Sequence, residues 1–439
     1  VQASLDAEAD AVTRLATTEA ATNLMRVFEL SEKSKKNRYR NYIDGSRLPS
    51  IDRAAVIGAG VMGAGITHWL TSRGLPVTMR DISPAAVANG VRSVEKLYRT
   101  GVARGILTEQ EAGRGRDLVF PSADPVSLQR ADIDIEAAVE DLELKKMIFR
   151  ELCRRTRPDA ILATNTSALP ISEIAWDMET CHPGRIAGLH FFNPVHRMKL
   201  VEIVVADATS PETEETLLRF TRRIGKTPVV VRDRPGFLVN RVLMPYLLES
   251  GRLIQNGISP GEIDAAMLEF GMPMGPLRLL DEIGLDVALH VARTMSSAFG
   301  ERFEIPGILS RLVDRGLLGR KRGEGFYQYD KRGHVLAKGH PSAALPDHPS
   351  LKPLQRRDIA QRLSLLMVNE CYRALEEGVC ADADTIDLAM IYGAGFAPFR
   401  GGPLHWAERL GRHRVADQLR KLAREEGRQF TPAPILLNE

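Results

Sequence analysis

The sequence predicts an α/β domain with a doubly wound sheet, followed by two repeated all-α domains. Between Arg53 and Asp233, short β-rich runs alternate with helical segments, a pattern that favours a mostly parallel sheet with helices on both faces. A glycine-rich loop follows the first of these runs. Beyond Phe237 the pattern is almost wholly helical, and one helical segment there is a partial copy of another.

The composition excludes several classes of protein. The chain has 439 residues, of which 44% are hydrophobic and 26% charged, as in an ordinary globular protein of two to four domains. Its 59 basic residues nearly balance 56 acidic ones, so nothing points to a nucleic acid as a partner. No apolar run approaches the roughly 20 residues that span a bilayer, so we expect no integral membrane segment.

The four cysteines, Cys153, Cys181, Cys371 and Cys380, show neither CxxC nor metal-type spacing. This spacing favours a reducing compartment over a disulfide framework, and we expect no bound metal. The chain shows no signal-peptide pattern. It begins with Val1 rather than Met, so we expect a further N-terminal region to precede it.

Residues 1–50 are predicted to form a linker helix and a basic linker. Five apolar residues indicate an amphipathic helical face: Leu15, Leu24, Val27, Phe28 and Leu30. The run from Glu32 to Arg40 is mostly basic, and we interpret it as a solvated linker rather than as a contact for an anionic partner. Asp44-Gly45 and Pro49 then predict a break in the chain.

Residues 51–233 are predicted to form the α/β domain. Its expected strands are the β-rich runs Ala54–Ile57, Val77–Met79, Ile133–Val139, Ile161–Thr164, Ile186–His190 and Val229–Val231. The turn-forming sequence Asp233-Arg234-Pro235-Gly236 closes this region.

Two helical domains are predicted to follow, at residues 234–345 and 346–439. Matching segments lie about 122 residues apart, with Leu248-Glu249, Gly257 and Ile263-Asp264 corresponding to Asn369-Glu370, Gly378 and Ile386-Asp387. This repetition predicts a duplicated unit whose copies pack together, and two copies are too few for a solenoid. The Pro-, Gly- and His-rich stretch Lys331–Pro353 is expected to connect them.

The loop Gly58-Ala59-Gly60-Val61-Met62-Gly63 predicts a dinucleotide site of the Rossmann type. Bulkier residues would block the tight turn and the close approach of the backbone to a pyrophosphate, although such a loop alone is as often a structural turn. Asp81 lies about 20 residues on, directly after an apolar run, where a carboxylate accepts hydrogen bonds from ribose hydroxyls and repels a 2′-phosphate. NAD is therefore expected rather than NADP. The neighbouring Arg80 is the one contrary feature, because an arginine there can accommodate a 2′-phosphate.

His190 and Glu202 are the candidate catalytic pair. His190 ends an apolar run, and a reversal of the chain at Asn193-Pro194 would bring the strand that contains Glu202 back beside it. A histidine there takes the proton of an alcohol while NAD takes a hydride, and the carboxylate fixes the histidine tautomer and stabilises the imidazolium. The alternative is a histidine that merely completes its hydrogen bonds at a strand end; His182 and His196 are nearby competitors, but neither ends an apolar run.

These motifs together resemble the L-3-hydroxyacyl-CoA dehydrogenases. The resemblance is carried by HFFNP at 190–194, KLVE at 199–202, Asn165-Thr166-Ser167, Ala138-Val139-Glu140 and PGFLVNR at 235–241. It runs from about Arg53 to the C-terminus. It implies an NAD-dependent enzyme that reversibly oxidises an L-3-hydroxyacyl-CoA to the 3-ketoacyl-CoA, with His190 as general base and Glu202 as its orienting partner.

The resemblance also implies roles for other residues. Ser167 would contact both the substrate oxygen and the nicotinamide, and Asn240 would position the 3-oxygen or the thioester carbonyl. Tyr392, in the second helical copy, would contact the substrate. Beside the loop residues Gly58, Gly60 and Gly63, the implied cofactor contacts are Met62, Asp81, Val139, Glu140, Lys145, Ser167 and Asn193.

Structural alternatives exist for four of these residues. Ser167 would be a helix cap before Pro170, Asn240 a turn or cap residue, Lys145 a solvated lysine, and Tyr392 a part of the core. Met62 packs against its neighbours under either interpretation.

The sequence departs from the family pattern at two positions. Asp141 stands where the family usually has Asn, which changes an amide contact to the cofactor. Ala168 replaces a second serine often found after Asn-Thr-Ser, so Ser167 is the candidate hydroxyl at this place.

The two helical domains narrow the resemblance to the dehydrogenase part of the multifunctional fatty-acid β-oxidation enzymes, of the trifunctional enzyme alpha subunit type. Residues 1 to about 45 resemble the helix that ends the enoyl-CoA hydratase domain of those enzymes. The hydratase domain itself is not found in this sequence, so we expect no hydratase activity. The resemblance further implies acyl-CoA as substrate, a thiolase subunit as partner, and a bacterial cytoplasmic location, with the mitochondrial matrix and the peroxisome as alternatives.

There are two rival functions, one a different dehydrogenase and one of a different class. A dehydrogenase of a small free hydroxy acid needs a compact pocket with a cation for the carboxylate, and the sequence shows no dedicated motif for one. A non-catalytic NAD-binding relative is disfavoured because Ser167, His190, Glu202 and Asn240 are retained together.

Overall fold

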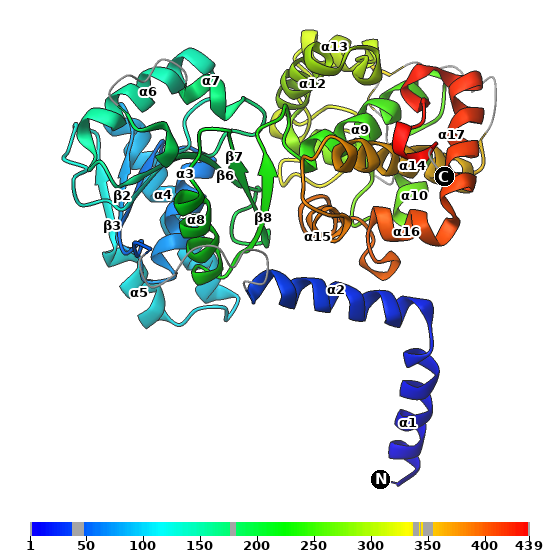
Figure 1. The fold of residues 1–439 in the computed structure, drawn as a ribbon, viewed down its shortest axis with the longest axis horizontal. Helices are drawn as coiled ribbons and strands as arrows, with labels where there is room; N and C mark the ends of the chain where they lie inside the picture. Colours follow the sequence, from blue (N-terminus) through cyan, green and yellow to red (C-terminus); the bar gives the residue numbers. More distant parts are fainter. Residues whose placement is uncertain are drawn as a thin grey trace. The chain divides into compact units, whose positions relative to one another are not determined.

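The structure, a computed structural model, describes residues 2–36, 48–175, 181–336, 342, 344–345 and 354–437 (Figure 1). The chain forms two compact units, one of Glu32–Phe237 and one of Val1–Ser31 together with Leu238–Glu439. The predicted break at Asp44-Gly45, the end of the basic run and most of the predicted connector at 331–353 lie outside the described residues.

The first unit is built on one sheet. Its described strands are ordered β3-β2-β1-β4-β5-β6-β7-β8, and all neighbours are parallel except β6 and β7. The order reverses at β1, as in a doubly wound Rossmann-type sheet, which confirms the predicted fold class. The strands are β1 (Ala54–Ile57), β2 (Val77–Arg80), β3 (Val119–Ser122), β4 (Ile133–Glu136), β5 (Ile161–Thr164), β6 (Ile186–Phe191), β7 (Leu200–Val205) and β8 (Thr227–Arg232).

Helices cover both faces of this sheet (Figure 1). Apolar side chains of α3 and α8 pack on one face, in a cluster with Val56 and Leu189. The opposite face carries α6 and α7, since Lys145 of α6 reaches Glu136 and a Cβ on Gly188 would meet Ile171 of α7. The helices are α3 (Val61–Thr71), α4 (Pro84–Ala103), α5 (Glu109–Asp117), α6 (Leu142–Arg155), α7 (Ile171–Ala175) and α8 (Pro211–Arg223).

Each predicted strand is present, with small differences at the ends. The run predicted as Ile133–Val139 ends as a strand at Glu136. The sequence does not predict β3, because Pro121 lies inside it. A strand at the edge of a sheet tolerates proline, since one of its sides has no strand to bond, and β3 lies at that edge.

The second unit is helical, and its helices repeat in one order. The first run is α9 (Val239–Gln255), α10 (Pro260–Phe270), α11 (Pro276–Ile283) and α12 (Leu285–Phe299), followed by α13 (Gly307–Asp314). The second run is α14 (Arg356–Glu376), α15 (Ala383–Ala394), α16 (Pro403–Leu410) and α17 (Arg412–Glu426). Helix α14 packs along α9 and α10, so the copies share one core. The predicted boundary near residue 345 falls in the connector and stays a prediction.

A buried aspartate that caps the following helix occurs at the same place in both copies. Asp264 of α10 accepts hydrogen bonds from the first amides of α11, and Asp387 of α15 does so from those of α16. In each case a Cβ on the glycine directly before the next helix, Gly275 or Gly402, would lie within 2.3 Å of the aspartate. Burial raises the pKa of Asp264 to about 6 and that of Asp387 to about 7. Equivalent caps in equivalent places support the duplication seen in the sequence.

The predicted apolar face of the N-terminal segment is wrong in part. The segment forms two helices, α1 (Gln2–Ala16) and α2 (Glu19–Lys35), and while Val27 and Leu30 are buried, Leu15, Leu24 and Phe28 are exposed. Polar contacts fix α2 on the second copy instead. The Arg26 guanidinium lies 2.6 Å from Asp384 Oδ1 and 3.0 Å from Asp387 Oδ2, and Asn23 donates to the Phe399 carbonyl. A pattern of apolar residues cannot reveal such polar docking.

The cysteines also differ from expectation. Cys153 and Cys181 form a disulfide between residues 28 apart in sequence, a separation that spacing rules do not recognise. Cys371 and Cys380 are buried thiols. No described helix combines the length and hydrophobicity needed to cross a membrane.

Asp134, in the middle of β4, carries an unusual carboxyl group. It is fully buried, and among the described residues neither of its oxygens has a hydrogen-bond partner. Burial raises the pKa of Asp134 to about 8, and the nearby Arg185 offsets this only in part. Because the folded pKa exceeds the ordinary value, the fold favours the protonated form. The stability contributed by that form is therefore lost as pH rises towards 8.

We expect Asp134→Asn to stabilise the protein more at pH 9 than at pH 5, by about 1–3 kcal/mol at the higher pH, because an amide cannot ionise. Thermal unfolding of both proteins at the two pH values measures this. Asp314→Asn, at an exposed position, is the control and should change the melting temperature equally at both. Equal shifts for Asp134→Asn at pH 5 and pH 9 would contradict the prediction.

Candidate active site

The loops that carry the predicted site residues of the first unit meet at one edge of the sheet. Strands β1, β4, β5 and β6 are parallel neighbours, so their carboxyl ends lie together. The glycine loop follows β1, Val139 and Glu140 follow β4, Ser167 follows β5, and His190 is the next-to-last residue of β6. Ligands of doubly wound sheets bind at this edge.

The three loop glycines are required for different reasons. At Gly58, where φ is 115°, a Cβ would lie 2.5 Å from the Ala137 carbonyl oxygen, and at Gly63 it would lie 1.8 Å from that of Gly58. At Gly60 a Cβ would meet nothing within 4 Å, and φ is an ordinary −70°. The fold therefore demands glycine at 58 and 63 but leaves open space at 60. The predicted close approach of a pyrophosphate to the backbone at Gly60 stays a prediction.

The carboxylate of Asp81 lies against the glycine loop. Its Oδ2 accepts a hydrogen bond from the Ala59 amide at 2.7 Å, inside the glycine loop, and Oδ1 accepts one from Ile82. Each carboxylate oxygen has a further lone pair to accept a ribose hydroxyl. The guanidinium of Arg80 lies 2.8 Å from Glu151 on α6, so the charge that would favour a 2′-phosphate is already paired.

A buried cation organises the turn after β4. Lys145 is 1% exposed, which overturns the alternative of a solvated lysine. Its Nζ donates to both carboxylate oxygens of Glu136, at 2.8 and 2.9 Å, and lies 3.4 Å from Glu140 Oε2. Glu136 also accepts hydrogen bonds from Thr164 and from the Ala138 amide. Lys145 thus holds two carboxylates together, and its predicted contact with the cofactor stays a prediction.

Glu140 holds the loop after β5. Its Oε1 accepts from the hydroxyls of Thr166 and Ser167, at 2.6 and 3.1 Å, and from the Ser167 and Ala168 amides. Burial raises the pKa of Glu140, but Lys145 and these hydrogen bonds outweigh it and the pKa is lowered. The ionised carboxylate therefore fixes Ser167 at the carboxyl edge of the sheet.

His190 and Glu202 meet as the predicted chain reversal requires. Strands β6 and β7 pair antiparallel with His190 opposite Glu202, and His190 Nδ1 lies 2.7 Å from Glu202 Oε2. The Glu202 side chain is fully buried and that of His190 is 7% exposed. The imidazole packs against Phe192 and Phe237, with centroid distances of 4.4 and 5.8 Å. An ionised carboxylate on Nδ1 keeps the proton there and leaves Nε2 as the basic nitrogen.

The competing histidines have local contacts of another kind. His182 Nδ1 accepts a hydrogen bond from the Gly184 amide at the start of a short 3-10 helix. The ring of His196 lies 6.4 Å from that of His68, and burial lowers its pKa. Within the described residues neither is paired with a carboxylate, which distinguishes both from His190.

Two structural alternatives are overturned. The first amides of α7 are capped by Asp233, which accepts from Ile171 and Ser172, so Ser167 is not the cap of that helix. Asn240 is the second residue of α9, inside the helix, and so is neither a turn nor a cap residue.

The remaining predicted residues are placed as follows. Met62 is half-buried at the start of α3, while Val139 and Asn193 are exposed in loops of the first unit. Asn240 and Tyr392 belong to the helical unit, each partly exposed, in α9 and α15. Their roles as ligand contacts stay predictions.

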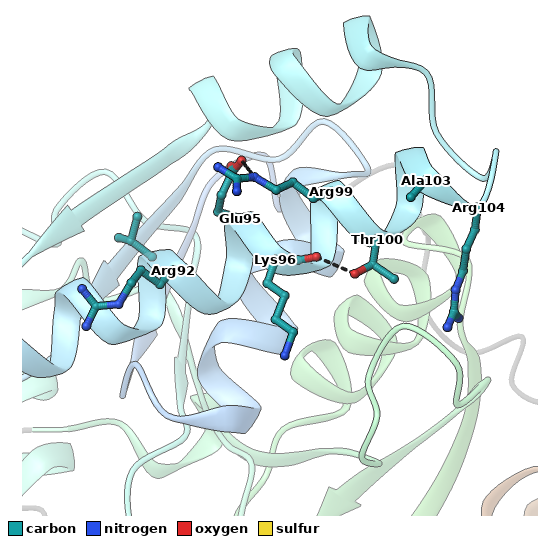
Figure 2. A pocket seen from close by; sticks show the side chains of 8 residues that line it. Arg92, Glu95, Lys96, Arg99, Thr100, Ala103 and Arg104 are labelled. Carbon is teal, nitrogen blue, oxygen red and sulfur yellow. Dashed lines mark hydrogen bonds and ion pairs between the residues drawn. The ribbon is translucent and has the colours of Figure 1, made fainter. Parts of the chain in front are cut away.

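A basic hollow of about 700 Å³ lies elsewhere on the first unit (Figure 2). Its lining residues come from helix α4 and from Arg104 directly after it, and they include Arg92, Lys96 and Arg99. Arg99 pairs with Glu95 of the same helix. No predicted site residue lines this hollow. It is an open groove along one solvated helix face.

Sequence reasoning missed Glu136 and Asp233. Glu136 sits in the alternating run Ile133-Asp134-Ile135-Glu136, so an acid at the end of a buried strand was a usable signal. Asp233 caps a helix 62 residues earlier in the chain, a contact for which the sequence holds no local signal.

Comparison with known proteins follows the same division of the chain. Residues 53–234 match the family described as 3-hydroxyacyl-CoA dehydrogenase, NAD binding domain, and residues 236–329 match 3-hydroxyacyl-CoA dehydrogenase, C-terminal domain. The 3-hydroxybutyryl-CoA dehydrogenase of Escherichia coli is 32% identical, with a TM-score of 0.77, and the match covers 89% of this chain and 98% of that one.

Two further solved structures are similar. The (S)-3-hydroxybutyryl-CoA dehydrogenase PaaH1 of Ralstonia eutropha is 36% identical, with a TM-score of 0.61, over 64% of this chain and 100% of that one. The dehydrogenase part of multifunctional enzyme 1 from C. elegans is 22% identical, with a TM-score of 0.65, over 94% and 98%, which is a likeness of fold alone. The identity to the first two, over nearly their whole length, goes beyond a shared fold. The chain belongs to the 3-hydroxyacyl-CoA dehydrogenase family and is an NAD-dependent dehydrogenase.

Proposed function

We propose that this protein reversibly oxidises an L-3-hydroxyacyl-CoA to the 3-ketoacyl-CoA, with His190 as general base and Glu202 as its orienting partner. The observation that carries the proposal is the 2.7 Å hydrogen bond between the buried His190 and Glu202 side chains at the carboxyl edge of the sheet. The names of the E. coli and R. eutropha relatives support a coenzyme A thioester as the substrate.

The proton moves through His190. In the oxidation direction, Nε2 accepts the proton of the 3-hydroxyl group, and the carbon–oxygen single bond becomes a carbonyl as the hydride leaves C3. NAD, when bound, supplies the acceptor for that hydride. Glu202 stabilises the resulting imidazolium through Nδ1–H, because opposite charges attract strongly in a buried site. The imidazolium then returns its proton to solvent, so a higher pH favours the ketone.

Two further residues complete the proposed site. Glu140 holds the Ser167 hydroxyl at the carboxyl edge, and we assign Ser167 to the substrate oxygen and the nicotinamide. We assign Asn240 to the 3-oxygen or the thioester carbonyl and Tyr392 to the substrate. Met62, Asp81, Val139, Glu140, Lys145 and Asn193 complete the proposed contacts with NAD. Support for Asp81 comes from its bond to the glycine loop, and the other assignments rest on the resemblance.

We expect the protein to oxidise NADH with acetoacetyl-CoA at least about 10²-fold faster than with free acetoacetate, because a substrate without its thioester loses remote binding energy that drives the chemistry. Absorbance at the NADH band, over thioesters from C4 to C16, measures the rates and the chain-length preference. Equal rates with the free acid would favour the small hydroxy-acid enzyme. NADH binding without turnover on any thioester would favour a non-catalytic relative.

The same proposal sets the reaction in fatty-acid β-oxidation, in a multifunctional enzyme of the trifunctional alpha subunit type. The resemblance of the sequence supports this, as does the docking of α2 on the second helical copy. We further propose a bacterial cytoplasmic location and a thiolase subunit as partner. Sedimentation of the purified chain with a candidate thiolase tests the partner, and unchanged sedimentation of both would remove it.

A further inference from the structure

Two reciprocal buried ion pairs join the two helical copies. Arg241 of α9 and Arg362 of α14 are equivalent residues, 121 apart, and so are Glu249 and Glu370. Arg241 Nε lies 2.7 Å from Glu370 Oε1, and Arg362 Nε lies 2.6 Å from Glu249 Oε1. All four residues are at most 5% exposed. Each copy therefore satisfies the buried arginine of the other.

The two exchanged pairs have matching surroundings. Each arginine has a second carboxylate, Glu377 at 2.8 Å for Arg241 and Glu426 at 2.9 Å for Arg362. Each guanidinium also lies over an aromatic ring, of Phe299 at 4.6 Å or of Phe430 at 5.6 Å. Loss of one partner of a buried pair leaves the other charge less well compensated and is destabilising. Equal changes in the two pairs should therefore have similar effects on stability.

The pairs differ in what lies beside them. Arg241 is the third residue of α9 and directly follows Asn240, whereas Arg362 is the seventh residue of α14 and follows Gln361. Helix α9 has no side-chain cap hydrogen bond at its start, and the amide of Val242 makes a backbone bond to Leu238 across the first turn. Leu238, Val239 and Val242 of this turn are buried, so apolar packing holds its backbone. The pair between Arg241 and Glu370 adds a polar anchor directly beside Asn240.

We propose that Glu370, through Arg241, is a positioning residue for Asn240. Glu370 then has a role in catalysis without touching the substrate: its carboxylate helps to order the turn that presents the Asn240 amide. This inference rests on the proposed function of Asn240. The reciprocal pair of Arg362 and Glu249 holds the copies together but orders no proposed site residue.

The test compares Glu370→Gln with Glu249→Gln in the full chain. Both should lower the melting temperature by similar amounts. We expect Glu370→Gln to lower kcat/KM for acetoacetyl-CoA by about 10-fold, because a small misplacement of a positioned group has a large effect on rate. The KM for NADH should not change. Glu249→Gln should stay within about twofold of wild type in kcat/KM, since a structural contact alone leaves the site in place.

Hydrogen exchange gives a readout that does not depend on activity. Glu370→Gln should speed exchange of the Val242 amide and the rest of the first turn of α9, and Glu249→Gln should not. Equal effects of the two variants on kcat/KM and on this exchange would overturn the proposal, as would no effect of either. If either glutamine variant does not fold, Glu370→Asp and Glu249→Asp form the same comparison with the charge kept.

A double variant separates this inference from the proposed function. In the Asn240→Ala background, Glu370→Gln should lower kcat/KM no further, because the group that it positions is gone. If Asn240→Ala alone leaves kcat/KM at the wild-type value, the role of Asn240 fails, while hydrogen exchange still shows whether Glu370 orders the turn. If Asn240→Ala lowers kcat/KM and Glu370→Gln adds its full effect on top, the positioning role of Glu370 is wrong and that of Asn240 stands.

Discussion

Replacing His190 with Gln should lower kcat by at least about 10²-fold with acetoacetyl-CoA and NADH, the scale for loss of a positioned acid–base group. Glutamine keeps a hydrogen-bonding side chain of similar reach but cannot carry the proton between substrate and solvent. The binding of NADH should be unchanged, because His190 contacts Glu202, Phe192 and Phe237 and is absent from the glycine loop. Steady-state assays together with NADH fluorescence titration separate the two effects.

Two controls sharpen this test. His196→Gln changes a histidine in the connection between β6 and β7 and should leave kcat within about twofold, since His196 is given no part in proton transfer. Glu202→Gln should be less damaging than His190→Gln. It should lower kcat by about 10- to 10²-fold relative to wild type, because it removes one charge-assisted hydrogen bond of about 1.5–3 kcal/mol. Wild-type kcat in His190→Gln would remove this residue from the mechanism. So would an equal loss in His196→Gln.

The sequence was sufficient for the parts of the site that depend on local pattern. A strand followed by glycines and a helix indicates a loop of the Rossmann type, and the structure places this loop between β1 and α3. The pairing of His190 with Glu202 was predictable because the turn signal at Asn193-Pro194 indicates that the chain reverses, and residues opposite each other on neighbouring antiparallel strands meet on one face.

What the sequence could not predict depends on contacts between distant residues. Lys145 looks like any lysine of a helix until the end of β4 brings Glu136 beside it. The bond of Cys153 to Cys181 needs the end of α6 to reach the start of β6. The reciprocal ion pairs between the helical copies form only when both copies are packed together, although the duplication itself is visible in the sequence. Pattern gives elements and turns, whereas these contacts arise from packing.

Replacing Gly60 with Ala should lower the affinity for NADH by about 10²-fold, a loss of about 2.7 kcal/mol, while the protein stays folded. The added methyl group meets no protein atom within 4 Å and φ is −70°, so the substitution causes no steric conflict in the fold. The methyl group would conflict with the pyrophosphate, because the pyrophosphate must approach the backbone at the same place, at the start of α3. Fluorescence titration with NADH and thermal unfolding measure the two quantities.

Gly113→Ala is the matched control for this change. A Cβ at Gly113, inside α5, also meets nothing within 4 Å, so the two variants add the same group to equally open space. Gly113→Ala should bind NADH like the wild type and be stabilised by up to about 1 kcal/mol, since alanine is the better helix former. Gly58→Ala and Gly63→Ala cannot serve, because their methyl groups would collide with backbone and disturb folding. Wild-type affinity in Gly60→Ala would show that the pyrophosphate does not lie against this loop, since nothing else in the described structure requires a glycine there.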